Sequence, residues 1–598
     1  MQNGNIGHEK YPESNSIDLL VPMLFIIGLP LLLAVAALSH RLRPVVVTLG
    51  PWSALPALGL ALWSPSHFSV ELPWLFLDMH LSLDKVGQFF LVGTVLLWTL
   101  VGVSARAFLV HDRENHRFFI AYLVALTGNL GLCMARDIPT FALCYALLTF
   151  SAYGLIVSEY TLATRRAGRI YLILAVLGDA LLVEAILLIT AAAGSQDIAR
   201  AHEAVATAPT PNLILPLLLV AMGIKIGIFP FHVWMPPAYS SVSTWASAVL
   251  SGSMVTAGFF GCIRLLPLGG ISLPGWDTLC ITTGAVTLFY GVLVGMTQTH
   301  PGTILAYATI SHIGVITAGL GIGMLMPQVW PLFFGTLMVY ALHHALGIAA
   351  LFLGLGVAKN ITGLMWPRRL VGLGLLVPAL SLAGAPLTSG ALTMNRFQTS
   401  ATLTPWAEQL GWGLTLAAIG TAVLMGRFLI EAWPRAQVAG PEPVVRLTTG
   451  IWLPWAILIL CGGLFAWVVP WSPPSETLTL LSLHGFWQSL WPILVGGLLV
   501  WGIEKNPRLL VALSIPPGDI VIWAEWLIHF AQERWRVRTR VAWQTWRSEL
   551  GSHPLLRNSG SWVSSIIEEA EGWLGQWMVL GAAFLLLAAL FLTLLIAT

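Results

Sequence analysis

Apolar stretches, each close to the length of one membrane crossing, follow one another along almost the whole chain. A helix of about 20 apolar residues crosses the hydrocarbon layer of a bilayer. The pattern therefore predicts an all-α polytopic membrane protein with about sixteen transmembrane helices. The predicted spans are residues 18–38, 44–64, 85–105, 117–135, 138–158, 167–192, 212–229, 244–266, 277–297, 302–323, 329–356, 369–390, 411–431, 448–470, 479–501 and 575–597.

Two segments depart from this pattern. Residues 67–83 alternate apolar and polar side chains, which is typical of a short β-hairpin outside the membrane. Residues 516–552 combine an apolar stripe with five arginines between Arg534 and Arg547, too many charges for a span. We expect a C-terminal amphipathic lateral helix there, lying along the membrane surface and reaching roughly 50 Å.

Two of the predicted spans are broken, at about residues 225–230 and 386–390. Pro230 breaks the first and Pro386 and Gly390 break the second. Paired broken helices are a pointer to inverted repeats, with an ion path at the breaks. The predicted organisation is N-terminal helices 1–116, a first repeat 117–266, a second repeat 277–431, additional helices 448–515, the lateral helix 516–552 and an anchor helix 575–598.

The composition agrees with a membrane protein. Hydrophobic residues make up 57% of the chain and charged residues only 9%, against roughly 25% charged in soluble domains. The net charge is +2 and the basic residues are scattered over loops, which excludes nucleic acid as an expected partner. The five cysteines lack metal-type spacing, so we expect neither a metal site nor a bound cofactor.

Basic residues also predict the orientation. Arginine and lysine clusters follow the odd-numbered spans, so those loops are expected in the cytoplasm. An even number of spans then places both termini outside the cytoplasm. The polar first residues lack the basic start of a cleavable signal peptide, so the first apolar run is expected to remain as a span. We expect the protein in a bacterial inner membrane.

Lys225 is the most informative single residue. It lies inside an apolar segment, five residues before Pro230. A lysine at the centre of a membrane helix costs roughly 2.5–3.5 kcal/mol, so such a residue is a candidate for ion transfer by default. The alternative is a structural lysine whose charged end reaches the membrane surface.

Four motifs indicate a family. They are GIKIGIFPFHVWMPPA from residue 223, SAVLSGSMVTAGFFGCIRL from 247, ILAYATISHIGV from 304 and HHALGIAALFLGLG from 343. Together they resemble the antiporter-like subunits of respiratory complex I, of Mrp-type cation/proton antiporters and of membrane-bound hydrogenases. The Gly178–Asp179 pair and the lateral helix resemble the distal, longest subunit of complex I. The resemblance implies a proton path through lysines, histidines and a glutamate along the middle of the membrane.

Most charged positions of that path are absent here. The family's glutamate of the fifth span falls at Ala146, its histidine of the eighth span at Leu250, and its later lysine or glutamate positions near Ile348 and Met394. Lys225 alone clearly matches a charged position of the path. A rewired path is therefore expected, with Asp179 as the counter-ion of Lys225 and Glu184 as a second candidate.

Three histidines complete the candidate ion path. His312 and His344 lie in apolar runs and match family positions, whereas His343, next to His344, is expected to face elsewhere. His232 follows the break at Pro230, where its ring is placed to move protons or to cap the freed helix end. For each histidine, an ordinary buried and hydrogen-bonded role remains the alternative.

These features predict a proton- or sodium-translocating subunit of a multi-subunit membrane complex, which couples cation movement to the work of membrane and peripheral partner subunits. Two alternatives remain open at this stage. One is the membrane subunit of an inorganic-carbon accumulation system with a zinc-containing, carbonic-anhydrase-like partner. The other is a structural subunit of a complex I-like assembly that no longer conducts. No catalytic motif appears, so no covalent chemistry is expected of this chain.

Overall fold

The computed structural model describes residues 16–63, 69–73, 78–109, 115–208, 211–360, 365–434, 448–468, 481–506, 515–516, 520 and 522. Residues 1–519 form one compact unit and residues 520–598 a second. The predicted lateral helix and the anchor helix at 575–598 lie outside the described residues.

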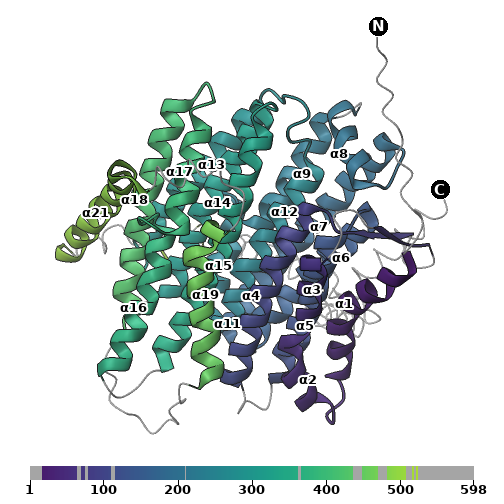
Figure 1. Ribbon diagram of the computed structural model, residues 1–598, viewed down its shortest axis with the longest axis horizontal. Coiled ribbons are helices and arrows are strands. Elements are labelled where there is room, and N and C mark those ends of the chain that lie inside the picture. The colour runs from purple at the N-terminus through teal and green to yellow at the C-terminus, as the bar shows by residue number, and fades with distance from the viewer. Residues whose placement is uncertain are drawn as a thin grey trace, which may run out of the picture. The chain divides into compact units, whose positions relative to one another are not determined.

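Helices dominate the described part of the chain (Figure 1). The first half contains α1 (Ser16–Ala36), α2 (Arg43–Leu49), η1 (Gly50–Trp52), α3 (Leu55–Trp63), α4 (Lys85–Leu109), α5 (Asn115–Met134), α6 (Ile138–Val157), α7 (Leu162–Ala193), α8 (Ile198–Thr207), α9 (Pro211–Ile226), η2 (Phe231–Trp234), α10 (Met235–Ser241), α11 (Thr244–Val249), the π-helical turn η3 (Leu250–Met254) and α12 (Val255–Leu265).

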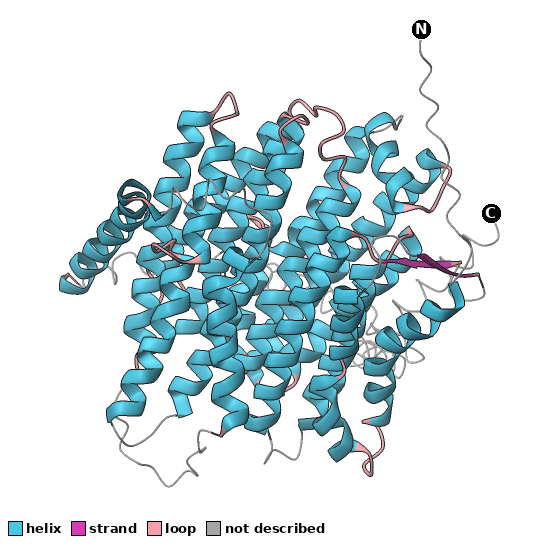
Figure 2. Ribbon diagram, in the orientation of Figure 1, coloured by secondary structure: helices cyan, strands magenta, loops and turns pink. Residues whose placement is uncertain are grey.

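The second half continues with α13 (Trp276–Gly295), α14 (Pro301–Leu325), α15 (Trp330–Asn360), α16 (Met365–Leu382), α17 (Ser389–Ala401), α18 (Ala407–Ala432), α19 (Thr449–Val468) and α21 (Leu483–Lys505). Strands β1 (Ser69–Leu72) and β2 (Met79–Ser82) form the predicted hairpin, which Figure 2 shows in magenta. They pair antiparallel, with Ser69 opposite Ser82 and Leu72 opposite Met79.

Thirteen of the described helices are long and apolar enough to cross a membrane. This confirms an all-α membrane protein but not the predicted count of sixteen. α16 carries Arg368 and Arg369 near its start, which lower its mean hydropathy, and the predicted span 575–597 lies outside the described residues. The predicted span 369–390 is also too long, because α16 ends at Leu382 and the chain re-enters a helix only at Ser389. α17, which begins at the end of that predicted span, and the short helix α8 were not predicted.

The centre of the unit is α15. Every residue in its most apolar stretch is buried, and nearly nine-tenths of the corresponding stretch of α14 is buried as well. α15 packs against α11, α14, α16 and α19. A helix buried on all sides is apolar all round, which explains why it shows no polar face in the sequence.

Glycines let α13 and α14 approach closely. A side chain at Gly284 would lie 2.5 Å from the Ala318 backbone nitrogen, and one at Gly314 would lie 2.4 Å from that of Leu288. Small residues permit such close contact between membrane helices, where packing replaces the hydrophobic effect as the driving force. This contact holds α14, and the histidine it carries, at a fixed place.

Candidate ion-transfer site

The first broken span places Lys225 one residue before the end of a helix. α9 ends at Ile226, and Gly227 takes a left-handed backbone with φ of 84°. The chain then passes Pro230, forms η2 and restarts as α10. The Trp234 indole donates a hydrogen bond of 2.9 Å to the Ile224 carbonyl, and Phe229 N–H donates to Thr287 Oγ1 at 3.2 Å. Side chains thus form hydrogen bonds with backbone groups near the break. Such groups need a partner inside a membrane, where no bulk water can take its place.

Lys225 points from α9 into the interface with α6. Its side chain is buried, with 6% of the residue exposed. The ammonium donates to Thr149 Oγ1 and lies 3.4 Å from the Tyr145 carbonyl oxygen. It also sits 3.8 Å from the centroid of the Tyr145 ring, where the ring's negative face stabilises a cation.

Asp179 approaches the same place from α7. The residue is 7% exposed, and its Oδ1 lies 3.3 Å from Thr149 Oγ1. Its other oxygen, Oδ2, accepts no hydrogen bond from the described residues. The Thr149 hydroxyl has one proton, which it can donate either to Asp179 or to the Tyr145 carbonyl at 2.9 Å. Lys225 and Asp179 are therefore joined through a group able to accept one proton and donate another.

A small cavity surrounds these groups. About 10 Å³ of it is open to the centre of a water molecule, about the room that one water needs. Lys225, Thr149, Asp179, Tyr145 and Tyr171 are among the residues that line it. The site therefore has room for a single water beside the ionisable groups.

Glu184, the second candidate counter-ion, does not reach this cavity. It is exposed on α7, because five residues of helix turn the side chain roughly 140° away from Asp179. The structure brings Asp179 to Lys225 and leaves Glu184 on another face.

His232 lies in η2, beyond the break, and is fully buried. Its ring stacks on Phe229 with centroids 5.7 Å apart and meets the Tyr290 ring edge-on at 4.9 Å. It is not among the residues that line the Lys225 cavity. This environment links it to α13, away from the Lys225 ammonium.

His312 and His344 stack on each other between α14 and α15, with ring centroids 4.7 Å apart. His312 Nδ1 lies 2.7 Å from the Tyr340 hydroxyl. Neither ring nitrogen of His344 has a hydrogen-bond partner among the described residues. His343 instead places Nδ1 3.0 Å from the Gly462 carbonyl on α19. The two adjacent histidines thus face different helices, and His344 is the one that meets His312.

The family positions that lack charge lie among apolar neighbours. Leu250 and Ile348 are fully buried, and Ala146 and Met394 are half-buried. Two buried charged residues were not singled out from the sequence: Arg396 on α17 is 5% exposed and Arg427 on α18 is 2% exposed. Arg427 stands inside the predicted span 411–431, a signal of the same kind as that of Lys225, whereas Arg396 falls between two predicted spans.

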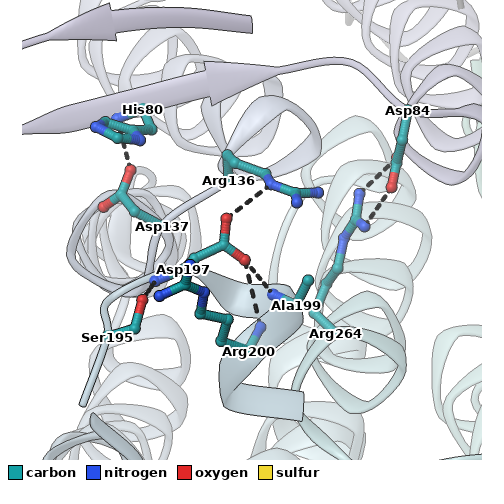
Figure 3. Close-up of polar contacts among 9 residues, drawn as sticks. All are labelled: His80, Asp84, Arg136, Asp137, Ser195, Asp197, Ala199, Arg200 and Arg264. Carbon is teal, nitrogen blue, oxygen red and sulfur yellow. Dashed lines mark hydrogen bonds and ion pairs between the residues drawn. The ribbon is translucent and has the colours of Figure 1, made fainter. Parts of the chain in front are cut away.

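A cluster of ion pairs joins several elements beside the hairpin (Figure 3). Arg264 on α12 makes two hydrogen bonds to Asp84, of 2.6 and 2.7 Å, and Arg136 pairs with Asp197 at 3.1 Å. Asp137 caps α6 through Thr140 N–H and accepts a bond from the His80 backbone. Burial raises the pKa of Asp84, but the hydrogen bonds and charge of Arg264 outweigh this and hold the pKa below its usual value.

Comparison with known proteins agrees with the motifs. Residues 135–396 match the model of the NADH:quinone oxidoreductase/Mrp antiporter transmembrane family. The antiporter subunit mnhA2 of Staphylococcus epidermidis is 30% identical over 417 residues, which cover 62% of this chain and 52% of that protein. Na(+)/H(+) antiporter subunit A1 of Staphylococcus haemolyticus is 27% identical over 54% of this chain and 43% of its own length.

A solved structure shows the same fold. A chain of the Mrp complex from Dietzia sp. DQ12-45-1b superposes with a TM-score of 0.68 and 21% identity, over 94% of this chain and 63% of that chain. The chain spans about half the length of the curated relatives it matches. The resemblance expected from the motifs is confirmed: residues 135–396 of this integral membrane protein are similar to the transmembrane region of the NADH:quinone oxidoreductase/Mrp antiporter family.

Proposed function

We propose that this chain is a cation-translocating subunit of a multi-subunit membrane complex. The observation that carries the proposal is the buried contact of Lys225 and Asp179 with one hydroxyl, beside a broken helix. A charged pair in a membrane interior is costly and marks an ion or proton path. The similarity to antiporter subunits supports the same conclusion and favours it over the two alternatives left open by the sequence.

In the proposed mechanism, the Lys225 ammonium gives a proton to the Thr149 hydroxyl while that hydroxyl gives its own proton to Asp179. The product is a neutral amine beside a neutral carboxylic acid, so the step moves charge without creating an isolated ion. The reverse step restores the pair. One water in the adjoining cavity would exchange a proton with the Asp179 carboxyl group, whose Oδ2 has no hydrogen-bond donor among the described residues.

In our proposal, His312 and His344 extend the proton path into the second repeat. His232 would lie on this path between the first and the second repeat. The stacked imidazoles offer ring nitrogens that exchange protons near neutral pH in water. The first repeat, residues 117–266, would hold the lysine station and the second repeat, residues 277–431, the histidine station. The partner subunits would supply the energy that drives the cation. We further propose a bacterial inner membrane with both termini outside the cytoplasm.

The test is ion flux in proteoliposomes that contain the purified complex. Lys225→Ala and Asp179→Asn should each reduce flux at least about tenfold, because either change removes a proton-carrying group. Glu184→Gln, on the exposed face of the same helix as Asp179, is the matched control and should conduct normally.

Unchanged flux in both Lys225→Ala and Asp179→Asn would refute this assignment of the path. Absence of flux from a correctly assembled wild-type complex would favour the structural-subunit hypothesis. Co-purification of a large zinc protein, rather than other antiporter subunits, would favour the inorganic-carbon hypothesis.

A further inference from the structure

The second broken span opens a larger cavity than the first. About 120 Å³ of it is open to water centres, against about 10 Å³ at Lys225. It lies where the chain leaves α16, and its walls come from α17, α18 and α21. The lining residues are Ala383, Gly384, Ala391, Met394, Asn395, Gln398, Thr415, Ala418, Gln488, Ser489, Trp491 and Pro492. By volume it holds several water molecules.

None of these lining residues is ionisable, although the cavity is rich in oxygen atoms. Asn395, Gln398 and Gln488 bring amide groups, and Thr415 and Ser489 bring hydroxyls. A proton relay needs groups that gain and lose protons, as Lys225 and Asp179 do. The lining of this cavity can solvate an ion but cannot carry a proton on its side chains.

The two hydroxyls are oriented as acceptors. Thr415 Oγ1 donates to the Gly411 carbonyl at 2.9 Å, and Ser489 Oγ donates to the Gly485 carbonyl at 3.1 Å. Each hydroxyl has one proton, so these bonds leave only lone pairs for anything inside the cavity. These two hydroxyls can therefore coordinate a cation but have no proton left to donate to an anion.

The backbone carbonyls at the second break also favour a cation over an anion. α16 ends at Leu382, and the amides of Ala383, Gly384 and Ala385 bond to the carbonyls of Ala379, Ser381 and Leu380. No backbone amide of the described residues donates to the carbonyls of Ala383 or Gly384, which line the cavity. The C-terminal end of a helix carries partial negative charge, and unwound carbonyls of this kind coordinate alkali cations in broken-helix transporters.

We propose that this cavity, named here the second-break cavity, binds a partly hydrated alkali cation. Three amide side chains, two hydroxyls and the carbonyls at the end of α16 replace part of its water shell. Because the lining is neutral, binding is weak and the ion is released readily. Arg396, the buried charge on α17, is not among the lining residues.

This inference rests on the proposed function and makes it more specific. The first repeat holds a proton-carrying pair in a space for one water, whereas the second holds a neutral, oxygen-lined space for several. The two stations would therefore handle different ions, protons at Lys225 and an alkali cation at the second-break cavity. A single chain would then have one site for each of the two ions that are exchanged.

The experiment measures cation-driven proton flux in proteoliposomes of the complex, over a range of NaCl or KCl and with choline chloride holding the ionic strength. Thr415→Val and Asn395→Leu each remove one oxygen donor while keeping the size of the side chain. We expect the half-saturating concentration of the coupling cation to rise about tenfold, with little change in the maximal flux. Separate NaCl and KCl series identify which cation is used.

Thr282→Val is the matched control, because Thr282 also donates to its own helix, at 2.7 Å to the Thr278 carbonyl, but lies exposed on α13. It should leave the half-saturating concentration unchanged. The melting temperature of the assembled complex provides a second readout that does not depend on flux. NaCl or KCl should raise it relative to choline chloride in the wild type, and less so in Thr415→Val.

These experiments test the proton path at Lys225 and the cation site in the second-break cavity independently. If Lys225→Ala abolishes flux but Thr415→Val and Asn395→Leu leave the half-saturating concentration unchanged, the cation site is wrong and the proton path stands. If Lys225→Ala conducts normally while the cavity variants shift the cation dependence, the proton path is wrong and the cation site stands. Equal melting temperatures in NaCl, KCl and choline chloride would also overturn the cation site.

Discussion

The Lys225 ammonium and the Asp179 carboxylate contact the same hydroxyl, that of Thr149, from two different helices. The three groups belong to α9, α7 and α6, so none of their separations along the chain indicates the contact. The arrangement makes Thr149 a link between two ionisable groups. Its role can be tested without removing either charge.

Thr149→Val should reduce ion flux at least about tenfold, because it replaces the bridging hydroxyl with a methyl group of the same size. Thr149→Ser keeps the hydroxyl and should retain most of the flux. Proteoliposome flux at equal amounts of assembled complex measures both. Thr127→Val, which removes a hydroxyl that bonds to the Leu123 carbonyl away from the cavity, is the control. Full flux in Thr149→Val would show that protons bypass this hydroxyl.

The ion pair of Asp84 with Arg264 should stabilise the protein in a pH-dependent way. The pKa of Asp84 is lowered in the folded state, so its contribution is present above the unfolded-state pKa and is lost as pH falls through the folded-state pKa. The unfolded-state value is about 3.9. The wild-type melting temperature should therefore drop more steeply below about pH 4 than that of Asp84→Asn.

At neutral pH, Asp84→Asn should lower the free energy of unfolding by about 2 kcal/mol, because it removes charge-assisted hydrogen bonds to Arg264. Asp78→Asn is the control, since Asp78 is largely exposed and its left-handed backbone, with φ of 66°, suits asparagine. Thermal unfolding in detergent at several pH values compares the three proteins. Parallel pH curves for wild type and Asp84→Asn would contradict the assigned role.

Gly390 is expected to be indispensable at the second break. A Cβ atom there would lie 1.7 Å from the Ser381 carbonyl oxygen, a backbone atom that cannot move aside alone. Gly390→Ala should cost about 3 kcal/mol or more of stability. Gly411→Ala on α18 has nothing within 4 Å of the added atom and should stabilise by up to about 1 kcal/mol, through helix propensity. Melting temperatures that fall equally in both variants would refute the steric argument.

Arg427 is expected to hold α21 against α18. Its buried guanidinium bonds to Glu504 and donates to the Gln298 carbonyl at 3.1 Å. Arg427→Met should destabilise the protein by about 3 kcal/mol, because Glu504 and the Gln298 carbonyl would lose the positive charge and the hydrogen bonds that Arg427 provides. Glu408→Gln, exposed near the start of α18, should have little effect. A double-mutant cycle with Glu504→Gln isolates the pair, and additive losses would show that the two residues do not interact.

The sequence determined the membrane class, the hairpin and both breaks. Apolar runs of about 20 residues cross a bilayer whatever their neighbours, and Pro230, Pro386 and Gly390 act on the local backbone alone. It also identified Lys225, since a charge in an apolar run is visible without a structure. These features depend on composition and short-range geometry, which can be recognised from the sequence alone. The predicted span 369–390 extends past the end of its helix, because α16 ends at Leu382.

Only the tertiary structure decided which candidate groups meet. It joined Lys225 to Asp179 through Thr149, left Glu184 exposed, and turned His344 toward His312 while His343 faces α19. It also placed the acceptor oxygens of Thr415 and Ser489 around one cavity. These contacts join residues far apart in sequence, through helix rotations set by close packing. A helix apolar on every side, such as α15, shows no periodicity from which its rotation can be predicted.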